Sequence, residues 1–149
     1  MIERLKIRLL IGIDPDVNKS GVAAYDLDRT DVRNRFVEIR SLSFYDIEIW
    51  LKVSKRFIEC VYISAGWLIK KTNWHGIKGI GTREKVAMQV GRNHQVGILL
   101  AEFCEREEIP YKLVRPTGKV SEKYFKSLCD WTGKTNQDER DAAMLLVGM

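Results

Sequence analysis

The chain has 149 residues, 45% of them hydrophobic and 30% charged, and a formal net charge of +5. A chain of this length can form one domain with a substantial core, and the lack of any apolar run near membrane-spanning length indicates a soluble globular protein rather than a membrane protein. Charged residues interrupt the N-terminal stretch MIERLKIRLLIGID, and no small-residue cleavage site is present. We therefore expect no signal peptide and a cytoplasmic location.

The cysteines and histidines limit the kinds of metal site that this chain can form. Three cysteines, Cys60, Cys104 and Cys129, stand far apart without a CxxC pair, which argues against a disulfide framework and a zinc site. The two histidines, His75 and His94, are too few for a histidine-based cluster. Any metal would have to be held by oxygen atoms, which favours Mg²⁺ or Mn²⁺.

The basic residues are concentrated in the middle of the chain. Residues 67–134 carry 13 Lys and Arg against 7 Asp and Glu, whereas the last 15 residues carry 1 against 3. A basic middle beside an acidic tail is typical of a polyanion-binding surface around a carboxylate site. The alternative is a solvated surface with a chance excess of positive charge.

The first candidate functional residue in chain order is Asp14, which follows an apolar run. We expect residues 8–14 and 21–26 to form two strands of a β-hairpin, with Asp14 at the mouth of a turn that contains Pro15. A carboxylate at the end of a buried strand is costly unless a cation lies opposite it, and a divalent metal would serve. The alternative is that Asp14 only caps the turn, as aspartate often does.

The rest of the chain predicts an alternation of strands and helices, with capping residues at helix starts and Pro or Gly at helix ends. The expected elements are a strand at 35–42, a helix from 44 to about 55, a buried parallel strand at 60–64, a loop at 65–81, a long helix from 83 to about 107 capped by Thr82, a strand at 111–114, a basic loop at 115–120, a helix between Ser121 and Gly133 that carries Trp131, and a last helix that starts at Asn136. The buried stripe expected on the long helix consists of Val86, Val90, Gly97, Leu100 and Phe103.

This order of elements is that of the ribonuclease H-like fold. We therefore expect a single α/β domain over residues 1–149, with a five-stranded mixed sheet of three antiparallel and then two parallel strands, flanked by helices. Right-handed crossovers place the carboxyl ends of the first and fourth strands side by side. Asp14 ends the first of these strands and Ser64 the fourth.

Two further carboxylates stand in the first turns of the last helix. Asp138 and Asp141 lie three residues apart and therefore on the same helix face, although the helix dipole favours acids there even without a role. In the expected fold the end of the first strand faces this helix, so that Asp14 joins them. Three converging carboxylates require a cation, and a pair of Mg²⁺ ions about 3.5 to 4 Å apart could activate water for attack on a phosphodiester.

Three stretches resemble RuvC-type Holliday junction resolvases. IGIDPDVNKSGVAAYD is similar to their first hairpin, QDERDAAMLL to their closing acidic helix, and LVRPTGKV, with the helix and the Trp-Thr-Gly that follow, to the segment between. The resemblance implies a homodimeric endonuclease that cuts branched DNA with Mg²⁺ or Mn²⁺. Asp14, Asp138 and Asp141 would be the metal ligands and catalytic residues, and Lys119 would contact phosphate.

One position departs from the family pattern. The fourth strand of the family ends in a glutamate that bridges the metals, whereas VYISAGW has Ser64 there, and a neutral hydroxyl is a poor Mg²⁺ ligand. The chain could be an inactive relative, carry an engineered substitution, or recruit another acid. Strand alternation points Glu59 to the opposite face, whereas Glu84 could reach the site if the loop folds back. Reduced activity is the interpretation that we favour. It leaves an impaired resolvase or a non-catalytic structure-specific DNA-binding protein as the two main hypotheses.

Other residues suggest how DNA would be held. Trp67 and Trp74 alternate with lysines and suit stacking on exposed bases, although packing of the loop explains them equally well. The long helix would form the dimer interface, by resemblance, and we expect neither a membrane nor a small-molecule substrate as partner. The candidate DNA-binding residues are Lys70, Lys71, Lys78, Arg115, Lys119 and Lys123.

Two weaker hypotheses concern a pair of polar residues and another protein class. Asn93 and His94 on the long helix could approach a scissile phosphate, but a pair satisfied by neighbours is the simpler interpretation. Sugar-kinase and actin-like ATPases also begin with an apolar strand that ends in Asp. They require a second phosphate-binding hairpin later in the chain, and this sequence has none.

Overall fold

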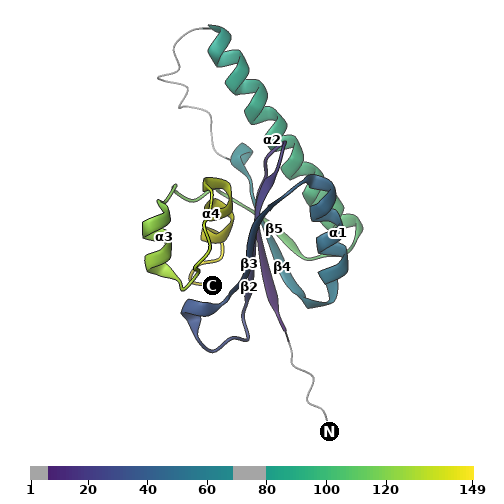
Figure 1. The fold of residues 1–149 in the computed structure, drawn as a ribbon. Helices are drawn as coiled ribbons and strands as arrows, with labels where there is room; N and C mark the ends of the chain where they lie inside the picture. The colour runs from purple at the N-terminus through teal and green to yellow at the C-terminus, as the bar shows by residue number, and fades with distance from the viewer. Residues whose placement is uncertain (1–6, 69–79) are drawn as a thin grey trace.

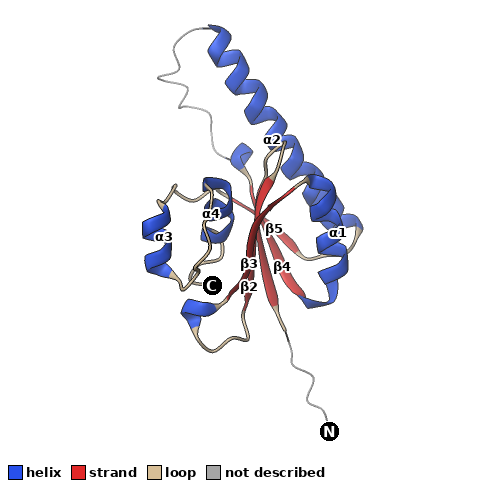
Figure 2. Cartoon of the chain, in the orientation of Figure 1, coloured by secondary structure: helices blue, strands red, loops and turns tan. Residues whose placement is uncertain are grey.

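The computed structural model describes residues 7–68 and 80–149 as a five-stranded sheet with helices on both faces (Figures 1 and 2). The strands are β1 Leu9–Asp14, β2 Ser20–Asp26, β3 Phe36–Leu42, β4 Ile58–Ser64 and β5 Tyr111–Val114, and the α-helices are α1 Phe44–Ser54, α2 Ile80–Arg106, α3 Glu122–Leu128 and α4 Gln137–Met144. Short 3-10 turns lie at Val32–Asn34, Lys55–Phe57 and Gly66–Leu68. None of the helices in the described ranges is both long and apolar enough to span a bilayer.

The sheet has the predicted mixed topology. Its strand order is β3-β2-β1-β4-β5, with β1, β2 and β3 antiparallel and β4 and β5 running parallel to β1. Ile13 of β1 pairs with Ile63 of β4, so the next residues, Asp14 and Ser64, end neighbouring strands at the same edge of the sheet. The expectation that these two positions meet is confirmed.

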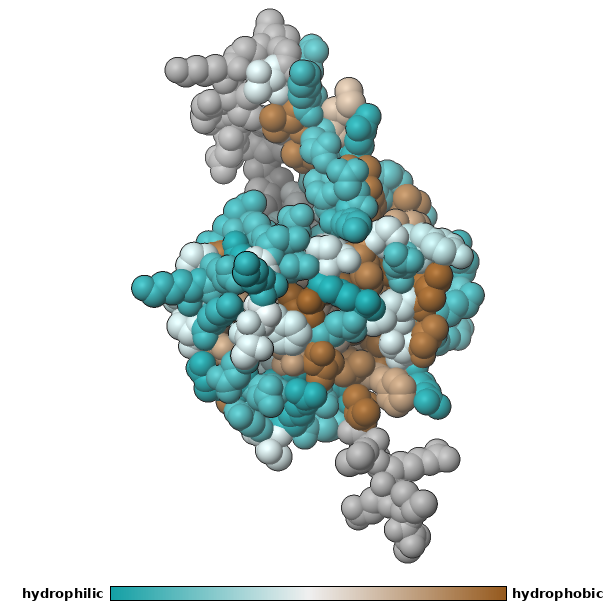
Figure 3. Space-filling view, viewed as in Figure 1, coloured by the Kyte–Doolittle hydropathy of each residue, from teal (hydrophilic) through white to brown (hydrophobic). Residues whose placement is uncertain are grey.

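Each face of the sheet has its own hydrophobic core. Because side chains alternate along a strand, Ile11 and Ile13 of β1 pack on the side of α1 and α2, whereas Leu10 packs on the side of α3 and α4 (Figure 1). The surface in Figure 3 is mostly hydrophilic, with hydrophobic groups over α1, where Ile49 and Val53 are exposed. The burial of β1 on both sides fixes the position of Asp14 at its end.

Helix α4 lies close to β1 and β2 because glycines face it. A Cβ at Gly12 would overlap the carbonyl of Ala142, and a Cβ at Gly21 would overlap the carbonyl of Asp138. These glycines therefore permit a contact that any larger residue would prevent. They bring the acidic first turn of α4 to the carboxyl end of β1.

A capping box fixes the start of α4, as the sequence predicted. The Asn136 side chain accepts from the Glu139 amide at 2.8 Å, and the Glu139 carboxylate accepts from the Asn136 amide at 2.9 Å. Ser41 of β3 donates to Glu139 at 2.9 Å and accepts from the Asn136 side chain at 3.0 Å. This network connects the helix start to the edge of the sheet.

Two predicted helix boundaries are wrong. Helix α2 begins at Ile80, so Thr82 lies inside the helix, because Thr is tolerated in a first turn as well as at a cap. Helix α3 ends at Leu128, and Trp131 lies beyond it. The chain turns away there because Cys129 is extended and the Asp130 amide donates to the Arg33 carbonyl at 2.8 Å. Trp131 nevertheless packs against the α3 and α4 core.

The buried stripe of α2 is only partly as expected. Gly97, Leu100 and Phe103 are buried, whereas Val86 and Val90 are half-buried. The reason is visible in Figure 1, where the first part of α2 extends past the end of the sheet. Only the second half of the helix has the sheet to pack against.

Candidate metal centre and nucleic-acid interface

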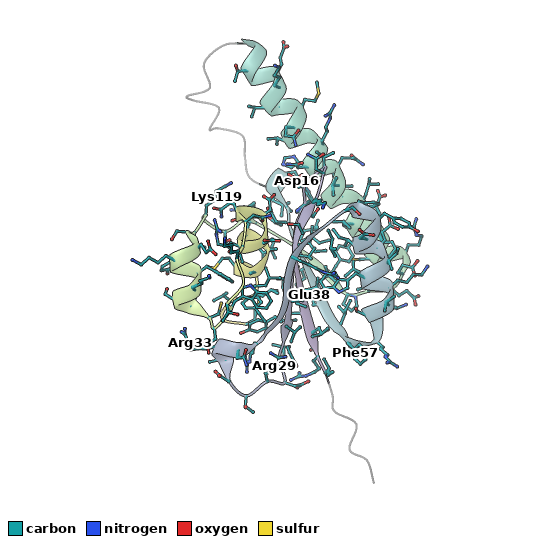
Figure 4. The ribbon with its side chains drawn as sticks, in the orientation of Figure 1. Asp16, Arg29, Arg33, Glu38, Phe57 and Lys119 are labelled. Atoms are coloured by element: carbon teal, nitrogen blue, oxygen red, sulfur yellow. The ribbon has the colours of Figure 1, made fainter. Side chains whose placement is uncertain are left out.

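A cavity of about 360 Å³ lies at the carboxyl ends of β1 and β4. Residues from five separate parts of the chain line it, namely the end of β1 with the turn after it, the end of β4 with the 3-10 turn after it, the middle of α2, the loop after β5 and the first turns of α4. In Figure 4, Asp16 labels the β1–β2 turn and Lys119 the loop beside α3 and α4, both at this end of the molecule. The cavity therefore collects residues that are far apart in the sequence.

Three of the predicted site residues converge in this cavity. Carboxylate oxygens of Asp14, Asp138 and Asp141 lie within 4.8 Å of one another. Asp14 is placed by the end of β1, and the other two by consecutive turns of α4. The predicted convergence of a strand end with the closing helix is present in the structure.

Asp14 carries the largest electrostatic perturbation at the site. The pKa of its carboxyl group is raised to about 8, first by burial and then by the negative charges of Asp141 and Asp138, against a lowering by Lys119. An ordinary aspartate has a pKa of 3.8. Without a cation, Asp14 therefore keeps its proton near neutral pH.

Asp138 is perturbed in the same direction. Burial raises its pKa first, and among the neighbouring charges Asp16 has the largest effect. The Asp14 and Asp138 side chains are hydrogen bonded, and this bond raises the pKa of Asp14 and lowers that of Asp138. The proton of the pair thus belongs mainly to Asp14.

Nearby cations do not neutralise the acidic side chains by direct ion pairs. Among the described residues, no ion pair involves Asp14, Asp16, Asp138 or Asp141. The closest basic residue in the sequence, Arg140, instead donates to the carbonyls of Val120 and Thr135, at 3.0 and 2.7 Å. It thereby fastens α4 to the basic loop and forms no ion pair with these acids, of which Asp141 accepts a hydrogen bond from the Gln137 side chain at 2.7 Å.

The donor set fits a hard divalent cation. Mg²⁺ binds oxygen ligands at about 2.0–2.1 Å, so ligands on opposite sides of one ion lie about 4 Å apart. Three carboxylates with oxygens within 4.8 Å of one another can reach such a geometry with small side-chain adjustments. Asp14, Asp138 and Asp141 are thus suitable ligands for Mg²⁺ or Mn²⁺.

Ser64 lines the same cavity at the position where the resemblance implies a glutamate. Its side chain is almost fully buried, with the residue 5% exposed, and its hydroxyl forms no hydrogen bond with a described residue. Neither suggested substitute acid lies in the cavity lining. Glu59 is exposed and pairs with Arg8 at 3.8 Å, and Glu84 is exposed on the projecting part of α2.

Asp16 is a cavity residue that the sequence reasoning missed. It lies in the turn two residues after Asp14, and its charge acts on Asp138. The available signal was the motif Asp-Pro-Asp, in which Pro15 separates two acids at the end of a buried strand.

Asn93 and His94 of α2 also line the cavity. The Asn93 side chain accepts from the Val17 amide at 2.9 Å, and the His94 ring lies edge-on to Trp67 with 5.6 Å between the ring centroids. Asn93 is thus satisfied by a neighbour, as the simpler interpretation held. Its bond also ties the acid-bearing β1–β2 turn to α2.

The predicted DNA-binding residues divide into three groups. Lys119 is exposed, lines the cavity and lowers the pKa values of Asp14 and Asp138. Arg115 and Lys123 are exposed on the neighbouring loop and on α3, outside the cavity lining. The remaining predicted residues, Lys70, Lys71 and Lys78, together with Trp74, lie outside the described residues.

The fold is similar to that of a solved structure described as T. thermophilus RuvC in complex with a Holliday junction substrate. The TM-score is 0.56 and the sequence identity 13%, over 91% of this chain and 88% of that chain. The chain therefore has the RuvC-like variant of the ribonuclease H-like fold. No family model matches it, and neither does any curated protein.

Proposed function

We propose that this protein is a metal-dependent endonuclease of the Holliday junction resolvase type, acting on branched DNA as a homodimer. The observation that supports it most is the convergence of Asp14, Asp138 and Asp141 in an open cavity of a RuvC-like fold. Structural aspartates are usually paired or exposed, whereas these are partly buried together without an ion pair from the described residues. Such an arrangement is costly unless it serves to bind a cation.

The acidic residues of the cavity would bind metal, and the basic residues around it would bind DNA. Asp14, Asp138 and Asp141 would hold two Mg²⁺ or Mn²⁺ ions, which when bound lower the pKa of water and stabilise charge on the phosphodiester. Lys119 lies beside the acids and would orient the scissile strand through a phosphate oxygen. Arg115 and Lys123 would extend this contact along the backbone without reading the sequence of bases.

A non-catalytic, structure-specific DNA-binding protein is the second candidate, and Ser64 favours it. The residue is buried in the cavity wall and adds no charge where the resemblance implies a metal-bridging glutamate. Loss of a residue that only supports a metal ligand typically lowers metal affinity or activity by about 10- to 100-fold, and loss of a ligand itself should cost at least as much. Both candidates have the same fold and bind branched DNA, and they differ in whether the protein cleaves a phosphodiester bond.

The first prediction separates these candidates with labelled four-way junctions and matched duplexes. Binding and cleavage are measured in Mg²⁺ or Mn²⁺ for the chain as given, for Ser64→Glu, and for Ser64→Glu combined with Asp141→Asn. We expect Ser64→Glu to raise junction cleavage by about 10-fold or more, because the cavity of about 360 Å³ can hold the longer side chain, and the second substitution to abolish the gain.

The other outcomes have distinct meanings. Tight junction binding without cleavage by any variant would support the binding protein and contradict the endonuclease. Equal affinity for junction and duplex would contradict both. Circular dichroism of each variant ensures that a loss of cleavage is not a loss of folding.

A further inference from the structure

We propose that Asn93 is a phosphate-contacting residue, whose side-chain amide nitrogen donates hydrogen bonds to a DNA phosphodiester bound in the cavity. The inference rests on the proposed DNA-binding function and goes beyond it, since the contact described above gives Asn93 only a structural role. It identifies the group that would hold the substrate from the side of α2.

The bond from the β1–β2 turn decides how the Asn93 amide is oriented. The side chain accepts from the Val17 amide at 2.9 Å. A backbone N–H can only donate, so the side-chain atom that it meets must be the oxygen. The nitrogen of the same planar amide is therefore directed away from the Val17 amide.

The amide nitrogen of Asn93 carries two N–H groups that the described part of the chain leaves unused. Among residues 7–68 and 80–149, none accepts a hydrogen bond from it. Asn93 is half-buried and lines the cavity together with Val90 and His94, whose spacing places all three side chains on one face of α2. The unused donors thus belong to the side of α2 that faces the cavity.

Asn93 and the proposed metal ligands belong to different walls of the cavity. Two of the acids come from α4, which packs on one face of the sheet, whereas α2 packs on the other face (Figure 1). Asp16, which Figure 4 labels, marks the β1–β2 turn that the Asn93 bond ties to α2. A phosphodiester that enters the cavity would have the acids on one side and the Asn93 donors on the other.

The chemistry of this wall suits a phosphate oxygen. Hydrogen bonds to an ionised acceptor are stronger than those between neutral groups, and asparagine is among the side chains that contact DNA phosphates. A neutral donor can bind the phosphate without forming an ion pair with the nearby acids. Lys119 on the basic loop would thus attract the phosphate by its charge, and Asn93 would orient it.

The test is the affinity of the full-length chain for a labelled four-way junction, measured by fluorescence anisotropy at a fixed Mg²⁺ concentration. We expect Asn93→Ala to weaken binding by about tenfold or more, because a hydrogen bond to a charged group is lost. The slope of log association constant against log salt should not change, since a neutral side chain displaces no counterion from DNA. The slope separates Asn93 from Lys119, whose loss should reduce it.

A second substitution separates the loss of the donors from a loss of folding. Aspartate keeps an oxygen that can accept from the Val17 amide, so Asn93→Asp should leave the turn attached to α2 while it removes both donors. Binding should weaken at least as much as in Asn93→Ala. Equal melting temperatures of Asn93→Asp and the parent check that the turn is intact.

Gln95 provides the matched controls. It carries the same kind of amide on the same helix, but it is exposed and lies outside the cavity lining. Gln95→Ala and Gln95→Glu repeat the truncation and the added charge, and they should leave the affinity for the junction nearly unchanged.

Methylphosphonate substitution in the DNA locates the contact. It replaces a charged phosphate oxygen by a methyl group, at one phosphate at a time around the crossover. In a double-mutant cycle, the phosphate that Asn93 contacts should lose most of its methylphosphonate penalty in Asn93→Ala, whereas other contacted phosphates should keep theirs. A residue that acts only through the turn would weaken binding without coupling to any one phosphate.

The outcomes separate this inference from the proposed function. Junction affinity of Asn93→Asp equal to or above that of the parent would overturn the role of Asn93 and leave the proposed function intact. A loss of affinity in Asn93→Ala without coupling to one phosphate would do the same. No measurable binding of DNA by the parent would overturn both.

Discussion

At the residue scale, the unusual feature of the site is the proton on Asp14. Burial and two neighbouring acids raise the pKa of this group to about 8, against 3.8 for an ordinary aspartate. Between these two pH values the folded protein binds more protons than the unfolded chain. The contribution of Asp14 to the free energy of unfolding is therefore complete below about pH 4 and is lost as the pH rises through about 8.

The second prediction follows from this linkage. In EDTA, the melting temperature should fall as the pH is raised from about 5 to about 8, and Asp14→Asn should flatten the dependence because asparagine does not titrate. Mn²⁺ should raise the melting temperature most at the alkaline end, where less work is needed to remove the proton. A metal-free melting temperature that rises over this range, or the same slope in Asp14→Asn, would contradict the assignment.

At the element scale, the site depends on how closely α4 approaches the sheet. The helix supplies two carboxylates, and its start is held by a capping box and by Ser41 of β3. Its position over β1 and β2 is possible because Gly12 and Gly21 have no side chain. A helix held farther from the sheet would carry Asp138 and Asp141 away from Asp14.

The third prediction uses one of these glycines. Gly21→Ala would place a methyl group against the carbonyl and amide backbone between Asp138 and Glu139, which cannot move independently of the helix. We expect a loss of about 1–3 kcal/mol in the free energy of unfolding, measured by urea denaturation, together with weaker Mn²⁺ binding.

Gly91→Ala in α2 is the matched control for this substitution. Apart from the neighbouring backbone of its own helix, no described residue lies within 4 Å of a Cβ at Gly91, and the residue is exposed within a helix. Alanine there should increase stability by about 0.5–1 kcal/mol and leave Mn²⁺ binding unaffected. If both substitutions have the same small effect, the close approach of α4 does not limit the site.

At the scale of the whole molecule, the acids and the surrounding cations form one surface at the carboxyl end of the sheet. Lys119 stands beside the acids, and exposed Arg115 and Lys123 lie on the adjoining loop and helix. The first part of α2 projects past the same end of the sheet (Figure 2). Nucleic acid bound here would contact phosphates mainly through the basic residues, so binding should depend strongly on salt.

The fourth prediction concerns this salt dependence. Without divalent cations, Lys119→Ala should weaken junction binding and reduce the slope of log association constant against log salt by about 1, as expected for one lost phosphate contact. Lys52→Ala is the control, because Lys52 lies on α1, on the other face of the sheet. An unchanged slope for Lys119→Ala would show that DNA does not approach the cavity from the side of the basic loop.

The local pattern of the sequence determined most of the elements and the three converging acids. Alternating or continuous apolar runs indicated the strands. Asn136, with Glu139 three residues later, marked the start of α4. The helical repeat placed Asp138 and Asp141 on the same helix face. The element order then implied that β1 and β4 are parallel neighbours. These features depend on a few residues within one or two turns, or on a general rule of chain connection, and can be read without coordinates.

Only the tertiary structure decided which other residues share the cavity. Asp16 lines the cavity because α4 comes close to the β1–β2 turn, and Glu84 is excluded because it is exposed on the part of α2 that projects past the sheet. The start of α2 and the end of α3 also differ from expectation, because Thr82 lies inside the first turn of α2 and the bond from the Asp130 amide to the Arg33 carbonyl turns the chain away after Leu128. Contacts between residues tens of positions apart in the sequence depend on the packing of whole elements. No local pattern of residue types indicates which of these residues come into contact.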